Sequence, residues 1–234
     1  MTGNMKIGNR TFTFGKKVYI MGILNVTPDS FSDGGKFDTL EHAMAQVEKM
    51  IEEGADLIDV GGESTRPGHQ QITEDEEIAR VVPVIQKIKE KYDIPVSIDT
   101  YKSRVAEAGL EASGVAEAGI CAGADLINDI WGLKYDNRMA EVIAKSGLPC
   151  CLMHNRNNTE YQDFVPDVVA DLKKCLAVAE KYGVKKENIM LDPGVGFGKT
   201  YEMNLDVMKH LELFNGLGYP MLLGTSRKSM IGLT

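Results

Sequence analysis

Seven polar residues end or follow short apolar runs in this chain, and their side chains are of types that bind ligands. They are Asn25, Asp59, Asp99, Asn128, His154, Asp192 and Ser226. Each one alone is also explained as a helix cap, because such side chains accept bonds from free backbone N–H groups. Seven caps are a weaker explanation. Carboxylates accept paired N–H bonds, and an asparagine both donates and accepts. The set predicts a site for a neutral heterocycle rich in N–H groups.

The most informative single stretch is residues 191–200. The apolar run 189–191 predicts a short buried strand, and Asp192 follows it. Gly194, Gly196 and Gly198 then predict a turn whose backbone comes close to a ligand. The end of the stretch is also that of a nucleotide-binding P-loop, but the first glycine of that motif is replaced by Pro193. Proline has no N–H to offer a phosphate, which disfavours the P-loop.

Three further loops carry candidate binding residues. Residues 25–35 are polar and end in two glycines, which is typical of a mobile lid and also of an ordinary surface loop. Residues 61–68 include Arg66, whose guanidinium suits bidentate binding of phosphate or carboxylate. Residues 224–228 add a hydroxyl group and two cations.

Metal binding is predicted only through a substrate. The four histidines, His42, His69, His154 and His210, lack the paired spacing of a zinc site. A Mg²⁺ ion held mainly by a substrate diphosphate needs few protein ligands, and Asn25 is predicted to be one.

The elements that position these residues alternate along the whole chain. Strands are predicted at 18–25, 55–60, 94–99, 124–128, 148–154, 189–192 and 219–225, with helices at 39–53, 74–92, from near 102, 163–182 and 200–214. Alternation predicts parallel βαβ units, and seven in a row favour a closed (β/α)8 TIM barrel over an open sheet. The strand ends then share one face, where the polar residues gather. A strand and turn at 11–17 are expected to cap the barrel floor.

Length and composition agree with one globular domain. The 234 residues are predicted to form a single barrel domain, 1–234, which lacks the eighth strand and helix at its C-terminal end. A net charge of -8 disfavours nucleic acid or an anionic membrane as the main partner. The four cysteines have no Cys-x-x-Cys spacing, and no apolar leader or spanning run is present, so we predict a reduced, cytoplasmic protein.

One irregularity is a direct repeat, residues 105–114 followed by 115–124. Ten helical residues turn about 1000°, roughly 80° short of three turns, so the two copies cannot bury the same face of one straight helix. We expect one copy to dock and the other to bulge into solvent. A partner-binding protrusion is the alternative.

Six motifs carry a resemblance to a known family. The first is Asn25-Val26-Thr27-Pro28-Asp29-Ser30-Phe31-Ser32-Asp33-Gly34-Gly35, and the others lie at 62–68, 97–100, 127–130, 192–199 and 226–228. In this order and over nearly the whole chain they resemble the motifs of the dihydropteroate synthases, which are TIM barrels. The resemblance implies a condensation of 6-hydroxymethyl-7,8-dihydropterin diphosphate with 4-aminobenzoate, which releases diphosphate and makes 7,8-dihydropteroate for folate synthesis.

The resemblance also implies residue roles. The pterin would be bound by Asp99, Asn128, Asp192 and Lys228, with Met153 and Gly224 in the same site. Thr65 and Arg66 would handle anionic groups, Ser226 would meet the aminobenzoate carboxylate, and Asn25 would lie by Mg²⁺ and diphosphate. The aromatic ring would be walled by Phe31, Pro67 and Phe197. Asp33 would stabilise a pterin-methyl cation formed when diphosphate leaves, and Arg66 and Lys228 complete the catalytic set.

Two other functions stay open. A related pterin-binding barrel, of the methyltransferase type, shares an Asp-Asn-Asp grip on the pterin, although its chemistry has no use for the loops at 25–35 and 62–68. An inactive truncated synthase is the second alternative, because the family's final strand carries an Arg-x-His pair that this sequence lacks. From that gap we expect open sheet edges, marginal stability and low turnover. A homodimer is left open.

Overall fold

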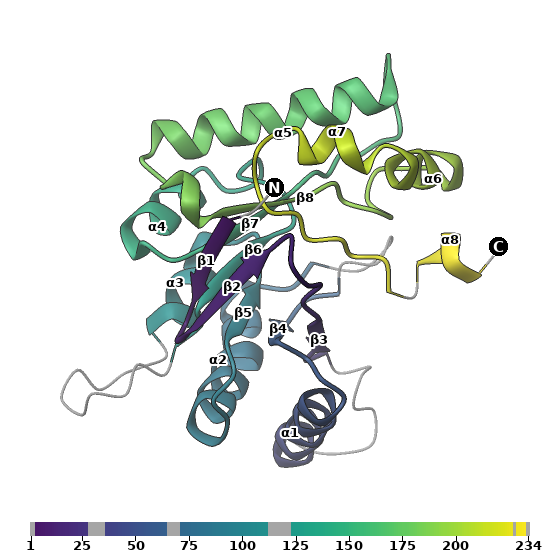
Figure 1. Ribbon diagram of the computed structural model, residues 1–234. Helices are drawn as coiled ribbons and strands as arrows, with labels where there is room; N and C mark the ends of the chain where they lie inside the picture. The colour runs from purple at the N-terminus through teal and green to yellow at the C-terminus, as the bar shows by residue number, and fades with distance from the viewer. Residues whose placement is uncertain (1–2, 28–35, 65–70, 112–122, 227, 233–234) are drawn as a thin grey trace.

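The computed structural model describes residues 3–27, 36–64, 71–111, 123–226 and 228–232. A sheet of six parallel strands forms its centre, with helices packed around it (Figure 1). The strands of this sheet are β3 (Met21–Asn25), β4 (Leu57–Gly61), β5 (Val96–Asp99), β6 (Leu126–Asp129), β7 (Cys150–Met153) and β8 (Ile189–Asp192). The helices are α1 (Lys36–Glu52), α2 (Glu74–Lys91), α3 (Ser103–Glu111), α4 (Met139–Ser146), α5 (Phe164–Lys181), α6 (Tyr201–Lys209), α7 (Leu211–Asn215) and α8 (Ser229–Gly232), with a 3-10 turn η2 at Lys186–Asn188.

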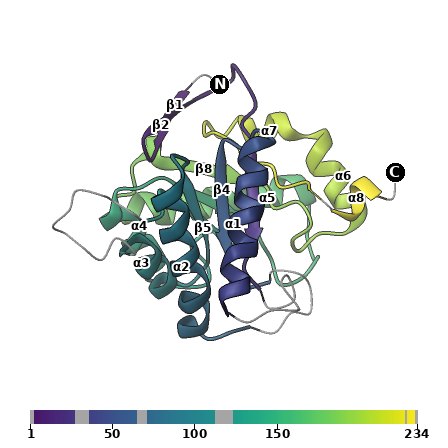
Figure 2. The same ribbon diagram turned by 90° about the horizontal axis from the view of Figure 1, so that it is seen from below.

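Each strand pairs with the next one in the sequence. The order is β3-β4-β5-β6-β7-β8, and every pair is parallel. The connecting helices cover the outer face: α1 to α4 are seen in the turned view of Figure 2, and α5 is seen in Figure 1. This is the winding of a (β/α) barrel, so the predicted fold class is confirmed. Beyond β8, Leu191 exchanges backbone hydrogen bonds with Pro220 and Leu222, both at 2.9 Å, and therefore continues the sheet. Among the described residues, β3 pairs on one side only, with β4.

Successive side chains of each strand point alternately towards the surrounding helices and into the barrel. Ile58, Val60 and Ile98 are fully buried in the larger core, which also holds the apolar faces of the helices. Side chains at neighbouring positions point the other way, into the barrel. The inward positions near the start of the strands are apolar: Leu57, Leu126, Cys151 and Met190. Two residues further along their strands stand Asp59, Asn128, Met153 and Asp192. The barrel interior thus changes from apolar to polar towards the strand ends.

A hairpin closes the apolar end of the barrel. It consists of β1 (Gly3–Ile7) and β2 (Arg10–Phe14), which pair antiparallel around a turn at Gly8. Met5, Ile7 and Phe12 pack on the inward apolar residues of the strands. The predicted cap at 11–17 is confirmed in place, while its partner strand β1 was not predicted.

Three predicted elements differ from the structure. The strand predicted at 18–25 begins only at Met21, and Val18 and Ile20 are 83% and 55% exposed. Their backbone is held instead by Asp56, whose carboxylate accepts a bond from the N–H of Ile20 at 2.8 Å. The strand at 219–225 shrinks to the bridge at Met221. The helix at 200–214 is divided into α6 and α7 at His210, whose φ of -117° and ψ of 27° are not helical.

The structure describes residues 105–111 of the first copy of the repeat and residues 123–124 of the second. Helix α3 buries Val105 and Ala106, and Gly109 lies so close to Ile98 that no Cβ would fit between them. The first copy therefore docks on β5, as one copy was expected to do. Residues 115–122 of the second copy lie outside the described residues, and so does the predicted bulge.

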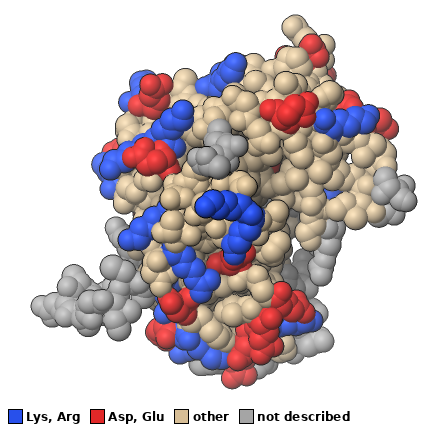
Figure 3. All heavy atoms as spheres, viewed as in Figure 1, with Lys and Arg blue, Asp and Glu red and all other residues tan. Residues whose placement is uncertain are grey.

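The surface mixes both signs of charge. On the face seen in Figure 3, Lys and Arg side chains are interspersed with Asp and Glu side chains. None of the described helices combines the length and the apolar character that crossing a membrane requires.

Candidate functional site

The polar end of the barrel gathers the inward side chains at the ends of the strands. The strand register places Asp99 beside Gly61 and Asn128, and it places Asp192 beside Met153. Gly61 has no side chain to separate its neighbours. A Cβ there would lie 3.3 Å from Asp99 Oδ2 and 3.6 Å from Asn25 Oδ1. The predicted pterin residues and the predicted metal ligand therefore lie at the same end of the barrel.

Asp99 offers an acceptor that the described protein does not use. Its Oδ1 is buried without a hydrogen-bond partner among the described residues. Burial, together with the negative charges of Asp59 and Glu77, raises the pKa of Asp99 well above its ordinary value. A carboxylate in this state gains from a ligand that brings N–H donors or a positive charge.

Asp192 is buried and half satisfied. Its Oδ1 accepts a bond from the N–H of Gly194 at 2.7 Å. Burial raises its pKa to about 6, while the positive charges of Lys199 and Lys228 act in the opposite direction. A Cβ at Gly224 would lie 3.6 Å from Asp192 Oδ2, so this glycine leaves space beside the second carboxylate oxygen.

Lys228 reaches this group from the far end of the chain. Its Nζ lies 4.1 Å from the centre of the Phe197 ring, a cation–π distance. Burial lowers the pKa of Lys228, and the charges of Asp192 and Asp99 oppose that shift. Gly196, with a φ of +80°, passes so close that a Cβ would lie 2.8 Å from Lys228 Cδ. One cation beside a glycine turn thus experiences the charges of two carboxylates.

An apolar wall adjoins the polar groups. Met153 packs with Tyr101 and Ile130, and Trp131 and Phe197 lie against them. Flat apolar surface beside convergent acceptors suits a planar ring with N–H groups along one edge.

Several predicted residues fall outside the described part of the chain. Phe31 and Asp33 belong to residues 28–35, and Thr65, Arg66 and Pro67 belong to residues 65–70. Ser226 is described and is exposed. Their roles stay predictions.

The structure adds supporting contacts around these residues. Asp59 was already one of the polar strand-end residues of the sequence analysis, whereas Glu63, Glu77 and Lys102 were not singled out. Asp59 accepts a bond from Asn128 Nδ2 at 3.0 Å. The ammonium group of Lys102 binds Glu63 at 2.6 Å and Glu77 at 2.7 Å, all three buried. Lys199 donates to backbone carbonyls of its own turn, so this lysine is not free for the phosphate of a P-loop. The sequence did contain a signal for two of these residues, because Glu63 lies within the motif at 62–68 and Lys199 within the motif at 192–199. Those motifs were interpreted through their other residues.

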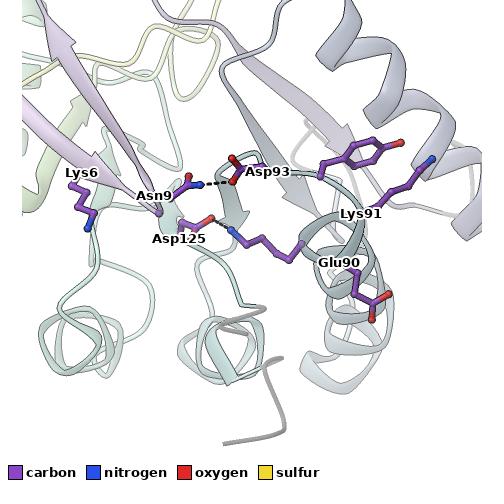
Figure 4. Close-up of a pocket in the computed structure, with 9 residues that line it drawn as sticks. Lys6, Asn9, Glu90, Lys91, Asp93 and Asp125 are labelled. Atoms are coloured by element: carbon purple, nitrogen blue, oxygen red, sulfur yellow. Dashed lines mark hydrogen bonds and ion pairs between the residues drawn. The ribbon is translucent and has the colours of Figure 1, made fainter. Parts of the chain in front are cut away.

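A second hollow lies at the opposite end of the barrel and has a structural explanation. It lies between the hairpin and the end of α2 (Figure 4). Asn9 donates to Asp93 there, and Lys89 pairs with Asp125 at 2.7 Å. These groups therefore satisfy one another, and the contact between Asn9 and Asp93 fastens the hairpin to the segment after α2.

The comparisons with known proteins agree with one another. Residues 21–234 match the model of a family described as pterin binding enzyme. A dihydropteroate synthase of Clostridium beijerinckii is 62% identical over 98% of this chain and 81% of its own length, and one of Bacillus subtilis is 51% identical over 94% and 74%. A crystal structure of dihydropteroate synthase from Clostridium difficile in the presence of pteroic acid superposes with a TM-score of 0.86 at 51% identity, covering 95% of this chain and 81% of that one. The Xanthomonas albilineans enzyme with 4-aminobenzoic acid gives 0.89 at 39% identity, covering 100% and 81%.

Proposed function

The chain belongs to the family of pterin-binding enzymes, and within it to the dihydropteroate synthases, and on this premise we propose a role for each residue of its site. The reaction is a transfer in folate biosynthesis. It condenses 6-hydroxymethyl-7,8-dihydropterin diphosphate with 4-aminobenzoate and gives 7,8-dihydropteroate and diphosphate.

The pterin ring is bound at the polar end of the barrel. Asp192 accepts paired N–H bonds from the amino-pyrimidinone edge, since its second oxygen faces the space left by Gly224. Asp99 accepts another through its unpartnered Oδ1. Asn128 supplies an amide, and Lys228 donates to a ring acceptor while it stacks on Phe197. Met153 lies against the face of the ring.

The second substrate enters from the loops. Ser226 is exposed at the mouth and binds the carboxylate of 4-aminobenzoate. Phe31, Pro67 and Phe197 wall its ring. Thr65 and Arg66 bind the anionic groups of the two substrates, for which a bidentate guanidinium is suited. The proposed binding partners are these two small molecules.

Bond cleavage precedes attack. The C–O bond to diphosphate breaks first, and Asp33 stabilises the positive charge that develops on the pterin methyl group. Arg66 and Lys228 neutralise negative charge while this happens. The amine of 4-aminobenzoate then forms the C–N bond and loses a proton, so no covalent link to the protein is needed.

Magnesium is proposed as the ion that accompanies the diphosphate. Among the described residues no group of three or more His, Cys, Asp or Glu side chains is placed to hold a metal. Asn25 is exposed at the rim, and a single amide oxygen fits an ion held mainly by substrate oxygens. When bound, the ion offsets the charge of the leaving diphosphate.

The observation that carries the proposal is the convergence of Asp99, Asn128 and Asp192 beside Lys228. The test is to incubate the chain with both substrates and Mg²⁺, and to measure dihydropteroate by chromatography. Product from the wild-type chain and its loss in Asp192→Asn support the proposal. No product from the wild-type chain, together with tight binding of methyltetrahydrofolate, favours the methyltransferase-type alternative.

Two broader predictions belong to this proposal. A reduced, cytoplasmic setting is supported by Cys150, Cys151 and Cys175, which are free and buried. A homodimer is checked by sedimentation velocity.

A further inference from the structure

Lys199 is tied to three acceptors that all belong to the protein. Its Nζ donates to the carbonyl oxygens of Gly194 at 2.8 Å and Phe197 at 2.9 Å. It also lies 2.9 Å from Nδ1 of His154. An ammonium group has three protons and no acceptor site, so these three partners use all of its donors. No donor is left for a substrate, and Lys199 is therefore not itself a catalytic residue.

The proton positions in this cluster follow from the contacts. Because Lys199 donates to Nδ1, the proton of the neutral His154 ring is on Nε2, which faces Asp171 Oδ2 at 3.3 Å. Burial and the charges of Lys199 and Lys134 lower the pKa of His154 to about 3, which keeps the ring neutral. Asp171 stays ionised because, against the effect of burial, Arg156 and Lys174 lower its pKa. Asp171, His154 and Lys199 form one chain of donors and acceptors.

The inner end of this chain shapes the glycine turn. Gly194 and Gly196 have φ values of +70° and +80°, and a Cβ at Gly194 would collide with the carbonyl oxygen of His154. The N–H of Phe197 already closes the turn on the carbonyl of Gly194 at 3.1 Å. Lys199 then bridges the two carbonyl groups at the ends of that turn. Burial lowers the pKa of Lys199 to about 7, and the three acceptors are satisfied together only while the amine is protonated.

This glycine turn fixes the positions of two residues of the site, Phe197 and Lys228. Phe197 carries the ring under the Lys228 ammonium group, at 4.1 Å, and Gly196 contacts the stem of the same lysine. Lys228 faces the charges of Asp192 and Asp99. A change in the turn therefore moves the cation on which the charges of Asp192 and Asp99 act.

We propose that Lys199, oriented by His154, is a positioning residue of the pterin site and acts through Phe197 and Lys228. This rests on the proposed function, which gives Phe197 and Lys228 their contacts with the substrates. In this proposal the side chains of Lys199 and His154 contact protein groups and neither substrate.

The test is a double-mutant cycle measured by binding of pteroic acid, which requires no turnover. Calorimetry on the full chain compares wild type, Lys199→Met, Phe197→Ala and the double variant. We expect Lys199→Met to weaken binding by about tenfold, and by less than about threefold when Phe197 is already Ala, because contacting residues couple. Additive losses, or wild-type affinity of Lys199→Met, overturn the proposal. Lys209→Met, an exposed lysine on α6, is the control and should bind as wild type.

Two measurements keep the test valid if Lys199→Met fails to fold. His154→Asn retains an acceptor near the position of Nδ1 and His154→Leu does not, so Asn should rescue binding and Leu should lower it by about tenfold. Nitrogen NMR of the wild-type His154 ring should show a protonated Nε2 and a bare Nδ1. The opposite tautomer, or equal binding by the two His154 variants, contradicts the role of the pair. If the wild-type chain binds pteroic acid but makes no dihydropteroate, the proposed reaction is wrong. The positioning role of Lys199 is still decided by the double-mutant cycle.

Discussion

Asn128 donates from its Nδ2 to Asp59 Oδ2 over 3.0 Å inside the barrel. An ionised carboxylate only accepts hydrogen bonds, so this contact turns the amide nitrogen of Asn128 towards Asp59 and its oxygen away from it. The amide oxygen is then available to a ligand N–H group. Asp59 Oδ1 and Ser97 Oγ are buried and have no hydrogen-bond partner among the described residues. Burial raises the pKa of Asp59, which marks it as costly for folding.

The first prediction concerns Asp59→Leu. Loss of the acceptor frees the Asn128 amide to turn, and we expect affinity for pteroic acid to fall about fivefold, near 1 kcal/mol, as for one hydrogen bond. Because a buried carboxyl is removed, the melting temperature should stay level or rise. Calorimetry and thermal melts measure the two effects. Ser97→Ala, at the neighbouring inward position, is the control. Equal affinity of Asp59→Leu and wild type would show that Asn128 needs no orienting partner.

The second prediction is a pH dependence that arises from Asp192. Its pKa of about 6 means that the carboxyl is largely protonated in the free chain at pH 5, although it binds N–H donors as a carboxylate. Affinity for the pterin should therefore rise with pH up to about 6 and level off above it, with roughly a tenfold deficit at pH 5. The contribution of Asp192 to the free energy of unfolding has the opposite pH dependence. Because the pKa of this carboxyl is raised in the folded state, the contribution is favourable at low pH and is lost as the pH rises through about 6.

Asp192→Asn separates this effect from that of Asp99, whose pKa is also raised. The variant should bind more weakly, on the order of 1.5–3 kcal/mol for each hydrogen bond lost to a charged group. It should also lose the component of the pH profile near 6. An unchanged profile would assign the titration to Asp99, and unchanged affinity would remove Asp192 from the pterin site.

The third prediction concerns Asp33→Ala. If Asp33 acts on the positive charge that develops when diphosphate leaves, the variant should bind the pterin substrate almost as well as wild type and turn over at least about tenfold more slowly. Calorimetry with the pterin substrate and single-turnover kinetics give the two quantities. A loss of affinity as large as the loss of rate would make Asp33 a ground-state contact. Asp163→Ala, at an exposed carboxylate before α5, is the matched control.

Much of this fold follows from local pattern. Apolar runs that end in Asp99, Asn128 and Asp192 mark the parallel strands, and the rule that parallel strand ends share a face brings these side chains together. The limits appear where long-range contacts decide. Val18 is as apolar as the other residues of the strand predicted at 18–25, yet its side chain is 83% exposed because no described element covers it. Lys199 has the sequence of a P-loop lysine, and only the distant His154 fixes its partners.

The last prediction concerns the buried cluster of Lys102, Glu63 and Glu77, which also holds the two ends of the segment after β4. Lys102 Nζ donates to the carbonyl of Ile72 at 2.9 Å, and the N–H of Ile72 donates to Glu63 Oε2 at 3.2 Å. Tyr101 donates to the other oxygen of Glu63. Burial raises the pKa of Glu77, whereas against burial Lys102 and Tyr101 lower that of Glu63. One cation thus balances two buried carboxylates.

Lys102→Met should therefore destabilise the chain by about 3–5 kcal/mol at pH 7, because it leaves Glu63 and Glu77 buried without a counter-charge. Both carboxyl pKa values should rise in the variant, so its deficit should shrink towards pH 5, where the groups take up protons, and grow as the pH rises. Urea unfolding at the two pH values measures this, and hydrogen exchange at Ile72 reports the loosened segment end. Lys87→Met removes only an exposed pair with Glu90 and should cost less than about 1 kcal/mol. A deficit in Lys102→Met that is equally small, or that does not change with pH, would mean that the carboxylates find other partners.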